Sequence, residues 1–165
     1  TMKRGHTIDR YLKQIDRMRS ASRDIAITTD IIVGFPGETE ADFLDTVKLV
    51  EYAGYDSAYI FKYSPRPGTP AFEMVDDVSA AEKTLRFLEL EKYQKLSQEK
   101  RLQRYIDKTL QVLAEGRSTR TRDGLTGHST CHKIVNFFGG ERLLGEVVNV
   151  RVTEIKTNSM FGEVQ

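Results

Sequence analysis

The sequence has one cysteine, Cys131, among its 165 residues. A single thiol excludes an internal disulfide framework and is typical of a reducing compartment, so we expect a cytoplasmic location. No apolar run approaches the roughly 20 residues of a membrane-spanning helix, and no membrane segment is expected. The basic start of the chain leads into an amphipathic pattern and not a continuous apolar stretch, so we expect that it is not a secretory signal.

The chain lacks a large excess of either charge: it has 25 Lys and Arg residues and 24 Asp and Glu residues, so its net charge is +1. Any site for a polyanion must therefore depend on a local patch. The length allows one ordinary domain, or a partial domain with a small one beside it. The chain shows no internal repeat.

The first hundred residues alternate between helix and strand patterns. The patterns predict a helix at 8–19 and then a strand at 25–33 that is buried on both faces. They next predict a helix that begins after its N-cap Thr39 and ends at Gly54, and a second strand at 57–63. This order predicts parallel strands with right-handed crossovers, as in a (β/α) barrel or a doubly wound sheet.

A long charged stretch follows at 78–104. It predicts an outer helix that leads into a linker, with apolar positions at Leu85, Leu88, Tyr93 and Leu96. Beyond residue 105 short alternating segments indicate a small all-β barrel, with strands at 109–114, 133–137, 146–153 and 160–164. We expect two domains, 1–100 and 101–165.

Two turns that follow predicted strands are candidate ligand-binding segments. In the first turn, which follows the strand at 25–33, glycines would let a ligand approach the main chain closely, and the start of the next helix would offer it unpaired N–H groups. The alternative to a ligand-binding segment is a tight structural turn. The second turn, which follows the strand at 57–63, contains three of the four prolines, so its backbone should be stiff. Its Arg66 could bind a carboxylate or a phosphate through two guanidinium N–H groups. The alternative is that Arg66 is a solvated residue at the rim of the barrel. The candidate residues are Gly34, Phe35, Pro36, Gly37 and Glu38 in the first turn and Ser64, Pro65 and Arg66 in the second.

Asp30 lies within a predicted buried strand, where a carboxylate needs a partner or a cavity. It is either structural or a catalytic candidate. In the β part, a basic loop predicted at 117–133 is a candidate RNA-binding patch, with Phe137 and Phe138 as stacking surfaces; the alternative is a solvated loop over two core rings. The patch residues are Arg117, Arg120, Arg122 and Lys133. The set of His128, Cys131 and His132 is too weak to assign a metal site.

Three strings resemble one family. Thr28-Thr-Asp-Ile-Ile-Val-Gly-Phe-Pro-Gly-Glu-Thr39 and Tyr63-Ser-Pro-Arg-Pro-Gly-Thr-Pro70 resemble the later barrel strands of radical S-adenosylmethionine (SAM) methylthiotransferases. The ending, which includes Thr157-Asn-Ser, resembles a TRAM domain, an OB-like barrel that holds tRNA. The resemblance implies the C-terminal part of a radical-SAM partial barrel followed by TRAM, and an α/β fold followed by a small β barrel.

The resemblance also implies an activity and its cofactors. The motifs most resemble those of the members that methylthiolate isopentenylated adenosine beside the tRNA anticodon, with SAM and two 4Fe-4S clusters. Both candidate turns would line the SAM pocket, and Arg4, in a segment similar to Met-x-Arg-x-Tyr/His-Thr, would face the active site. The cluster motif Cys-x-x-x-Cys-x-x-Cys is missing, so we expect a fragment that is inactive without the N-terminal remainder of the protein.

Other interpretations stay open on the sequence. The chain could be a non-enzymatic RNA-binding module of the TRAM type, or part of a methylthiotransferase for threonylcarbamoyl-adenosine in tRNA or for a ribosomal protein. A further alternative is radical chemistry like that of coproporphyrinogen oxidase, an enzyme that also has a Gly-x-Pro-Gly turn after a strand. That alternative would not explain the TRAM-like ending of this chain. A half barrel would also expose a strand edge near 25–33, which predicts self-association.

Overall fold

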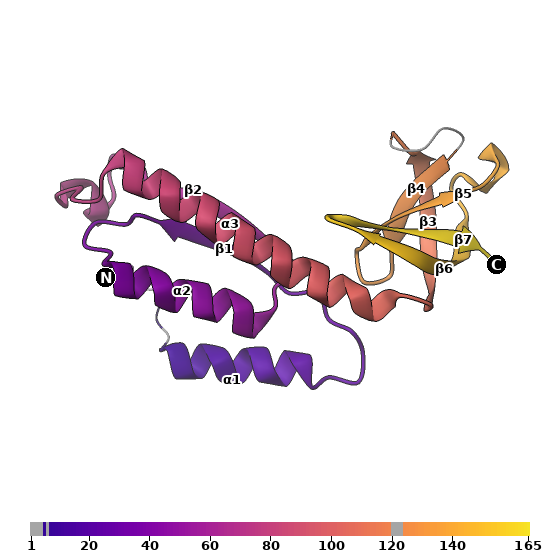
Figure 1. Ribbon diagram of the computed structural model, residues 1–165, viewed down its shortest axis with the longest axis horizontal. Coiled ribbons are helices and arrows are strands. Elements are labelled where there is room, and N and C mark those ends of the chain that lie inside the picture. Colours follow the sequence, from indigo (N-terminus) through magenta and orange to yellow (C-terminus); the bar gives the residue numbers. More distant parts are fainter. Residues whose placement is uncertain (1–4, 6, 120–123) are drawn as a thin grey trace.

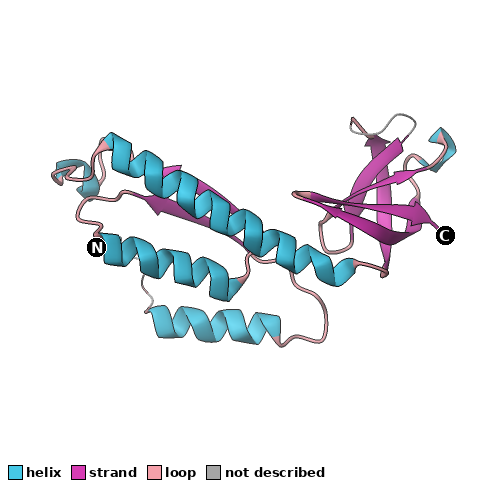
Figure 2. Cartoon of the chain, in the orientation of Figure 1, coloured by secondary structure: helices cyan, strands magenta, loops and turns pink. Residues whose placement is uncertain are grey.

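A computed structural model describes residues 5, 7–119 and 124–165 of the chain. The described residues form an α/β part and, at one end of it, a closed β barrel (Figures 1 and 2). The elements of the first part are α1 (Ile8–Arg19), β1 (Thr28–Val33), α2 (Glu40–Ala53), β2 (Ser57–Lys62), the 3-10 turn η1 (Pro70–Glu73) and α3 (Ala80–Leu102). The short turn η2 (Gln103–Tyr105) leads to β3 (Thr109–Arg117), β4 (Gly124–Ser129), β5 (Ile134–Phe138), η3 (Glu141–Leu143), β6 (Val147–Lys156) and β7 (Ser159–Val164).

Local sequence signals set the limits of α2. The Thr39 hydroxyl accepts from the Asp42 N–H while the Asp42 carboxylate accepts from the Thr39 N–H, which is a capping box. Gly54 ends the helix in the left-handed conformation, at φ 55°. Between these two caps, Phe43, Val47 and Val50 form a buried stripe, at the spacings of four and three that one helix face requires.

The two strands β1 and β2 pair in parallel, with Asp30 opposite Tyr59 and Ile32 opposite Phe61. Helices α2 and α3 cover one face of this sheet, and α1 lies beside α2 (Figure 1). The prediction that 25–33 is a strand buried on both faces is wrong. The strand begins at Thr28, and Val33 is its fully buried residue, because no element among the described residues covers the second face.

The predicted apolar positions of α3 are largely wrong. Leu85, Leu88 and Leu96 are exposed. The face of α3 that packs inward carries polar groups that bind the loops of the α/β part, and its buried residues are Lys83, Arg86, Leu90, Gln94 and Leu102. Charge pattern alone could not reveal this, since Arg86 pairs with Glu38, 48 residues away, and Gln94 donates to the Tyr55 carbonyl, 39 residues away.

The barrel closes in the order β3-β4-β5-β7-β6, and every pair is antiparallel except β5 with β7. Alternate residues such as Val112 and Ala114 point into its core, as period-2 alternation requires. The predicted loop at 117–133 is wrong in part, because 124–129 form β4. Its Gly-Leu-Thr-Gly-His-Ser sequence has weak strand propensity, so pairing with β3 and β5 decides its structure.

The predicted linker after α3 is also wrong. Leu102 and Tyr105 are buried in the core of the barrel, so the helix runs directly into it. The barrel lies near the amino ends of β1 and β2, and both strands point away from it (Figure 1). None of the helices in the described part of the chain is long and apolar enough to cross a membrane.

Candidate functional site

The turn after β1 is closed by its own side chains. The Gly34 N–H donates to the Glu38 carboxylate at 2.7 Å, and the Gly37 N–H donates to Asp77 at 2.7 Å. The Thr39 N–H is held by Asp42. Three N–H groups of this turn, those of Gly34, Gly37 and Thr39, are therefore occupied by carboxylates in this structure.

Glu38 joins this turn to α3. Its carboxylate accepts from Arg86 Nη1 at 2.7 Å, both side chains are largely buried, and Arg86 Nη1 also donates to the Glu38 carbonyl at 3.0 Å. Burial lowers the pKa of Arg86, but the hydrogen bonds and charges of Glu38 and Glu82 outweigh it and leave that pKa above its usual value. The guanidinium is thus a permanent cation that fixes the position of the turn.

We expect Glu38→Gln to lower the free energy of unfolding by about 1.5–3 kcal/mol, the usual contribution of hydrogen bonds to charged groups. The amide that replaces the carboxylate leaves Arg86 without that counter-charge in a largely buried position. Glu163→Gln is the control, because Glu163 pairs with Arg151 at 3.2 Å on the surface. Chemical denaturation of both variants checks this, and equal losses would contradict it.

The turn after β2 is exposed, as its candidates Ser64, Pro65 and Arg66 all show. Tyr63 anchors its start: the hydroxyl donates to the Ala71 carbonyl at 2.8 Å, and the ring meets Phe35 edge to face at 5.1 Å. This aromatic contact connects the two candidate turns. Both therefore lie together at the carboxyl ends of the parallel strands, where α/β proteins commonly bind ligands.

Asp30 is exposed on the uncovered face of the sheet, not buried as predicted. It lies opposite Tyr59, and Ile32 lies opposite Phe61, so the same face carries a carboxylate and two aromatic rings. Tyr59 is 62% exposed and Phe61 52%. A face of this kind can bind a ligand that combines a positive charge with a flat ring.

The candidate RNA-binding residues of the barrel do not form one group. Arg117 is exposed and pairs with Glu141, whereas Lys133 is 8% exposed and its Nζ lies 2.6 Å from Asp56. Lys133 is thus unavailable to a polyanion, and its prediction as a patch residue is corrected. Arg4, Arg120 and Arg122 lie outside the described residues.

The two candidate stacking rings differ in the same way. Phe137 is fully buried in the barrel core, so its prediction is wrong. Phe138 is 58% exposed and meets Phe161 at 5.2 Å in an edge-to-face pair on the outer surface. Sequence reasoning missed Phe161; strand alternation could have placed it on the outer face, but only the pairing of β5 with β7 brings it to Phe138.

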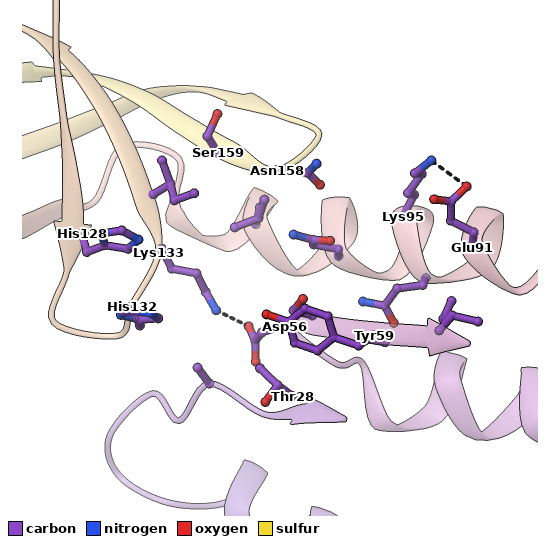
Figure 3. Close-up of a pocket in the computed structure, with 18 residues that line it drawn as sticks. Thr28, Asp56, Tyr59, Glu91, Lys95, His128, His132, Lys133, Asn158 and Ser159 are labelled. Atoms are coloured by element: carbon purple, nitrogen blue, oxygen red, sulfur yellow. Dashed lines mark hydrogen bonds and ion pairs between the residues drawn. The ribbon is translucent and has the colours of Figure 1, made fainter. Parts of the chain in front are cut away.

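A cleft of about 460 Å³ separates the sheet and α3 from the barrel (Figure 3). His128, His132 and Lys133 approach it from β4 and the following turn, and Asn158 and Ser159 approach it from the β6–β7 turn (Figure 3). The imidazoles of His128 and His132 stack at 4.6 Å. The cleft lies at the amino ends of β1 and β2, opposite the two candidate turns.

Asp56 is the anion at the base of this cleft, and the sequence analysis missed it. Its carboxylate accepts from Lys133 at 2.6 Å, from the Ile27 N–H at 2.8 Å and from Arg19 and Arg101 at 3.4 Å each. Burial raises the pKa of Asp56, but these hydrogen bonds and charges outweigh it and place the pKa below its ordinary value. Asp56 thereby links the barrel to the α/β part.

The chain does not supply ligands for an iron-sulfur cluster. A cluster needs three or four thiolates, and Cys131 is the one cysteine of the sequence. Its sulfur lies 3.4 Å from the Tyr105 hydroxyl and 3.3 Å from Ser129 Oγ. Among the described residues, no three His, Cys, Asp or Glu side chains converge in a way that could hold a metal ion.

Comparisons with known proteins identify both parts. Residues 1–50 match the Radical SAM superfamily, and residues 103–165 match the TRAM domain. Proteins named tRNA-2-methylthio-N(6)-dimethylallyladenosine synthase are similar over 99% of this chain: 48% identical in Thermoanaerobacter sp. (strain X514), 45% in Alkaliphilus oremlandii and 42% in Alkalilimnicola ehrlichii. The chain spans 35–36% of the length of these relatives. By these matches residues 1–50 are similar to the radical SAM superfamily and residues 103–165 to TRAM domains, which confirms the family resemblance of the motifs.

Proposed function

We propose that the complete protein is a tRNA methylthiotransferase that adds a 2-methylthio group to isopentenylated adenosine beside the anticodon. The observation that carries the proposal is the pairing of a radical SAM segment with a TRAM domain in one chain that is 42–48% identical to synthases of that name. Residues 1–100 would contribute to the radical SAM domain, and residues 101–165 would form TRAM. The proposed partners are SAM, tRNA and the N-terminal remainder of the protein.

SAM would lie at the carboxyl ends of β1 and β2. The turn at Gly34–Glu38 and the turn at Ser64–Arg66 come together there through Phe35 and Tyr63, which supports a shared pocket. The uncovered sheet face offers the Asp30 carboxylate to a cationic group and the rings of Tyr59 and Phe61 to an adenine. The fit is thus to a positively charged adenosyl compound. When bound, SAM would supply the radical and the methyl group.

The tRNA would contact the outer surface of the barrel. Phe138 is exposed and meets the half-buried Phe161 edge to face, and RNA-binding barrels commonly stack unpaired bases on such rings. Arg117 lies on the surface at the end of β3, next to the segment that contains Arg120 and Arg122. We propose these three arginines as phosphate contacts, without Lys133.

Two 4Fe-4S clusters would be bound by other parts of the complete protein, since this chain has a single cysteine. We expect the full-length protein with reconstituted clusters to methylthiolate isopentenylated tRNA in the presence of SAM and a reductant. The 165-residue chain alone should give no product under the same conditions. Mass spectrometry of the digested tRNA checks both expectations.

Three outcomes would contradict this proposal in whole or in part. Product from the isolated chain would show that the missing cysteines are not needed. An inactive full-length protein that contains its clusters and still binds tRNA would favour the non-enzymatic RNA-binding alternative. Product on threonylcarbamoyl-adenosine tRNA alone would keep the reaction and replace the substrate.

A further inference from the structure

The two candidate turns and the segment before α3 meet at one side chain, that of Lys83. Lys83 lies in the first turn of α3, at the end of the helix that points away from the barrel (Figure 1). It is only 7% exposed, which is rare for a lysine, because a buried ammonium costs free energy unless it is paired. Lys83 makes one contact with each of the three segments.

The first contact is an ion pair with the segment before α3. Lys83 Nζ lies 2.6 Å and 2.5 Å from the two carboxylate oxygens of Asp76. The next residue, Asp77, accepts a hydrogen bond from the Gly37 N–H at 2.7 Å. Two neighbouring carboxylates thus connect this segment to α3 and to the first candidate turn.

The second contact is with Tyr63, where the second candidate turn begins. Lys83 Nζ lies 5.1 Å from the centre of the Tyr63 ring, within the range of a cation–π interaction. The same ring meets Phe35 of the first turn edge to face. Lys83 therefore holds the ring that joins the two turns.

The third contact is with the main chain of Gly34. A Cβ at this position would lie 2.3 Å from Lys83 Cγ and 3.1 Å from its Cδ, so the stem of the lysine fills the space that another side chain would occupy. Gly34 also has a φ of 70°, which glycine adopts at little cost. The close approach of α3 to the first turn thus requires glycine on one side and the unbranched stem of Lys83 on the other.

We propose that Lys83 is a positioning residue of the SAM site, which holds the two turns at the separation that one adenosyl ligand requires. The inference deepens the proposed function and rests on it for the identity of the ligand. Because its ammonium is paired with Asp76, Lys83 acts on SAM through Gly34 and Tyr63 and not by direct contact. Without Lys83 the turns would have to be ordered when SAM binds, and that cost would appear as lost affinity.

The ammonium can be removed without leaving an unpaired buried charge. The Asp76 side chain is 33% exposed, so water can solvate its carboxylate in Lys83→Met. Methionine also keeps an unbranched stem beside Gly34. The apolar core of the α/β part, which includes Phe43 and Leu90, is untouched by this change. We therefore expect the melting temperature of Lys83→Met to stay close to that of the wild type.

The test uses the full-length protein with reconstituted clusters. Lys83→Met should bind SAM about tenfold more weakly in equilibrium dialysis, which corresponds to roughly 1.4 kcal/mol. Its KM for SAM should rise by a similar factor, while kcat at saturating SAM and the affinity for isopentenylated tRNA should change less than about twofold. Lys83→Arg should recover most of the SAM affinity, because it keeps a cation for Asp76 and for the Tyr63 ring.

Lys95→Met is the matched control on the same helix. Lys95 pairs with Glu91 at 3.1 Å, and both side chains are exposed. Its loss should leave SAM affinity unchanged. Hydrogen–deuterium exchange gives a readout that does not depend on catalysis: in the absence of SAM, peptides that cover 34–38 and 63–70 should exchange faster in Lys83→Met than in Lys95→Met, and saturating SAM should remove the difference.

Three outcomes would overturn the inference. They are unchanged SAM affinity in Lys83→Met, a lower melting temperature with unchanged SAM affinity, and a lower kcat with an unchanged KM for SAM. The second would show a structural role, and the third would place Lys83 in the chemical step. If the wild type with its clusters binds no SAM, the proposed function falls as well, whereas SAM binding and methylthiolation that no Lys83 variant alters would remove this inference alone.

Discussion

Asp56→Ala is expected to lower the free energy of unfolding of the chain by about 3–5 kcal/mol, the usual cost of removing one partner from a buried ion pair. Lys133 and Asp56 are both buried, and Arg19 and Arg101 share the same carboxylate. Without it, the side chains of Arg19, Arg101 and Lys133, and that of Arg104 at 4.0 Å, would be left close together with no shared carboxylate. Because Lys133 belongs to the barrel and Asp56 to the α/β part, the variant should also loosen the contact between them.

Chemical denaturation measures the first effect, and the rate of proteolysis at the junction near Leu102 measures the second. Asp45→Ala is the control, since Asp45 forms an exposed pair with Lys48 at 2.8 Å and its loss should change stability little. Similar losses in the two variants would show that the cluster at Asp56 contributes no more than a surface pair.

The same carboxylate predicts a dependence on pH. The folded-state pKa of Asp56 is lowered below its ordinary value, so its contribution to stability is fully present above the unfolded-state pKa, about 3.9. That contribution is lost as the pH falls through the folded-state pKa. The free energy of unfolding of the wild type should therefore fall as the pH drops below about 4. In Asp56→Asn this side chain cannot titrate, so the free energy of unfolding should fall less over the same pH range.

Gly127→Ala is expected to disrupt the barrel, with a loss of at least about 3 kcal/mol. A Cβ at this position in β4 would lie 1.8 Å from the Leu113 carbonyl oxygen and 2.8 Å from its carbon. Both atoms belong to the backbone of β3, which pairs with β4 on one side and β6 on the other. Neither strand can move away without breaking ladder hydrogen bonds.

Gly116→Ala in β3 is the matched control for this prediction. A Cβ there would meet nothing within 4 Å, and the backbone is not in the left-handed region. Its melting temperature should match or slightly exceed that of the wild type, because alanine restricts the unfolded chain more than glycine does. Far-ultraviolet circular dichroism during heating compares the two variants, and a folded Gly127→Ala protein with unchanged melting temperature would contradict the clash.

Much of the fold follows from short-range patterns. The capping box at Thr39 and Asp42, the left-handed Gly54 and the apolar stripe of α2 were all predictable, because their partners lie within a few residues along one helix. Strand alternation likewise predicted four of the five barrel strands. The strand β4 escaped, since its glycines and polar residues gain their order from neighbouring strands and not from their own propensity.

The sequence by itself determined the likeness to radical SAM proteins and TRAM domains, through its strand-end motifs and its ending. It also determined that a chain with one cysteine cannot by itself supply the thiolates of an iron-sulfur cluster. Tertiary structure alone decided that Lys133 is buried on Asp56, that the turn after β1 is closed by Glu38, and that Lys83 contacts both candidate turns. The physical reason is separation along the chain: Lys133 and Asp56 are 77 residues apart, and a charged or polar residue reveals neither its burial nor its partner until the fold brings the two together.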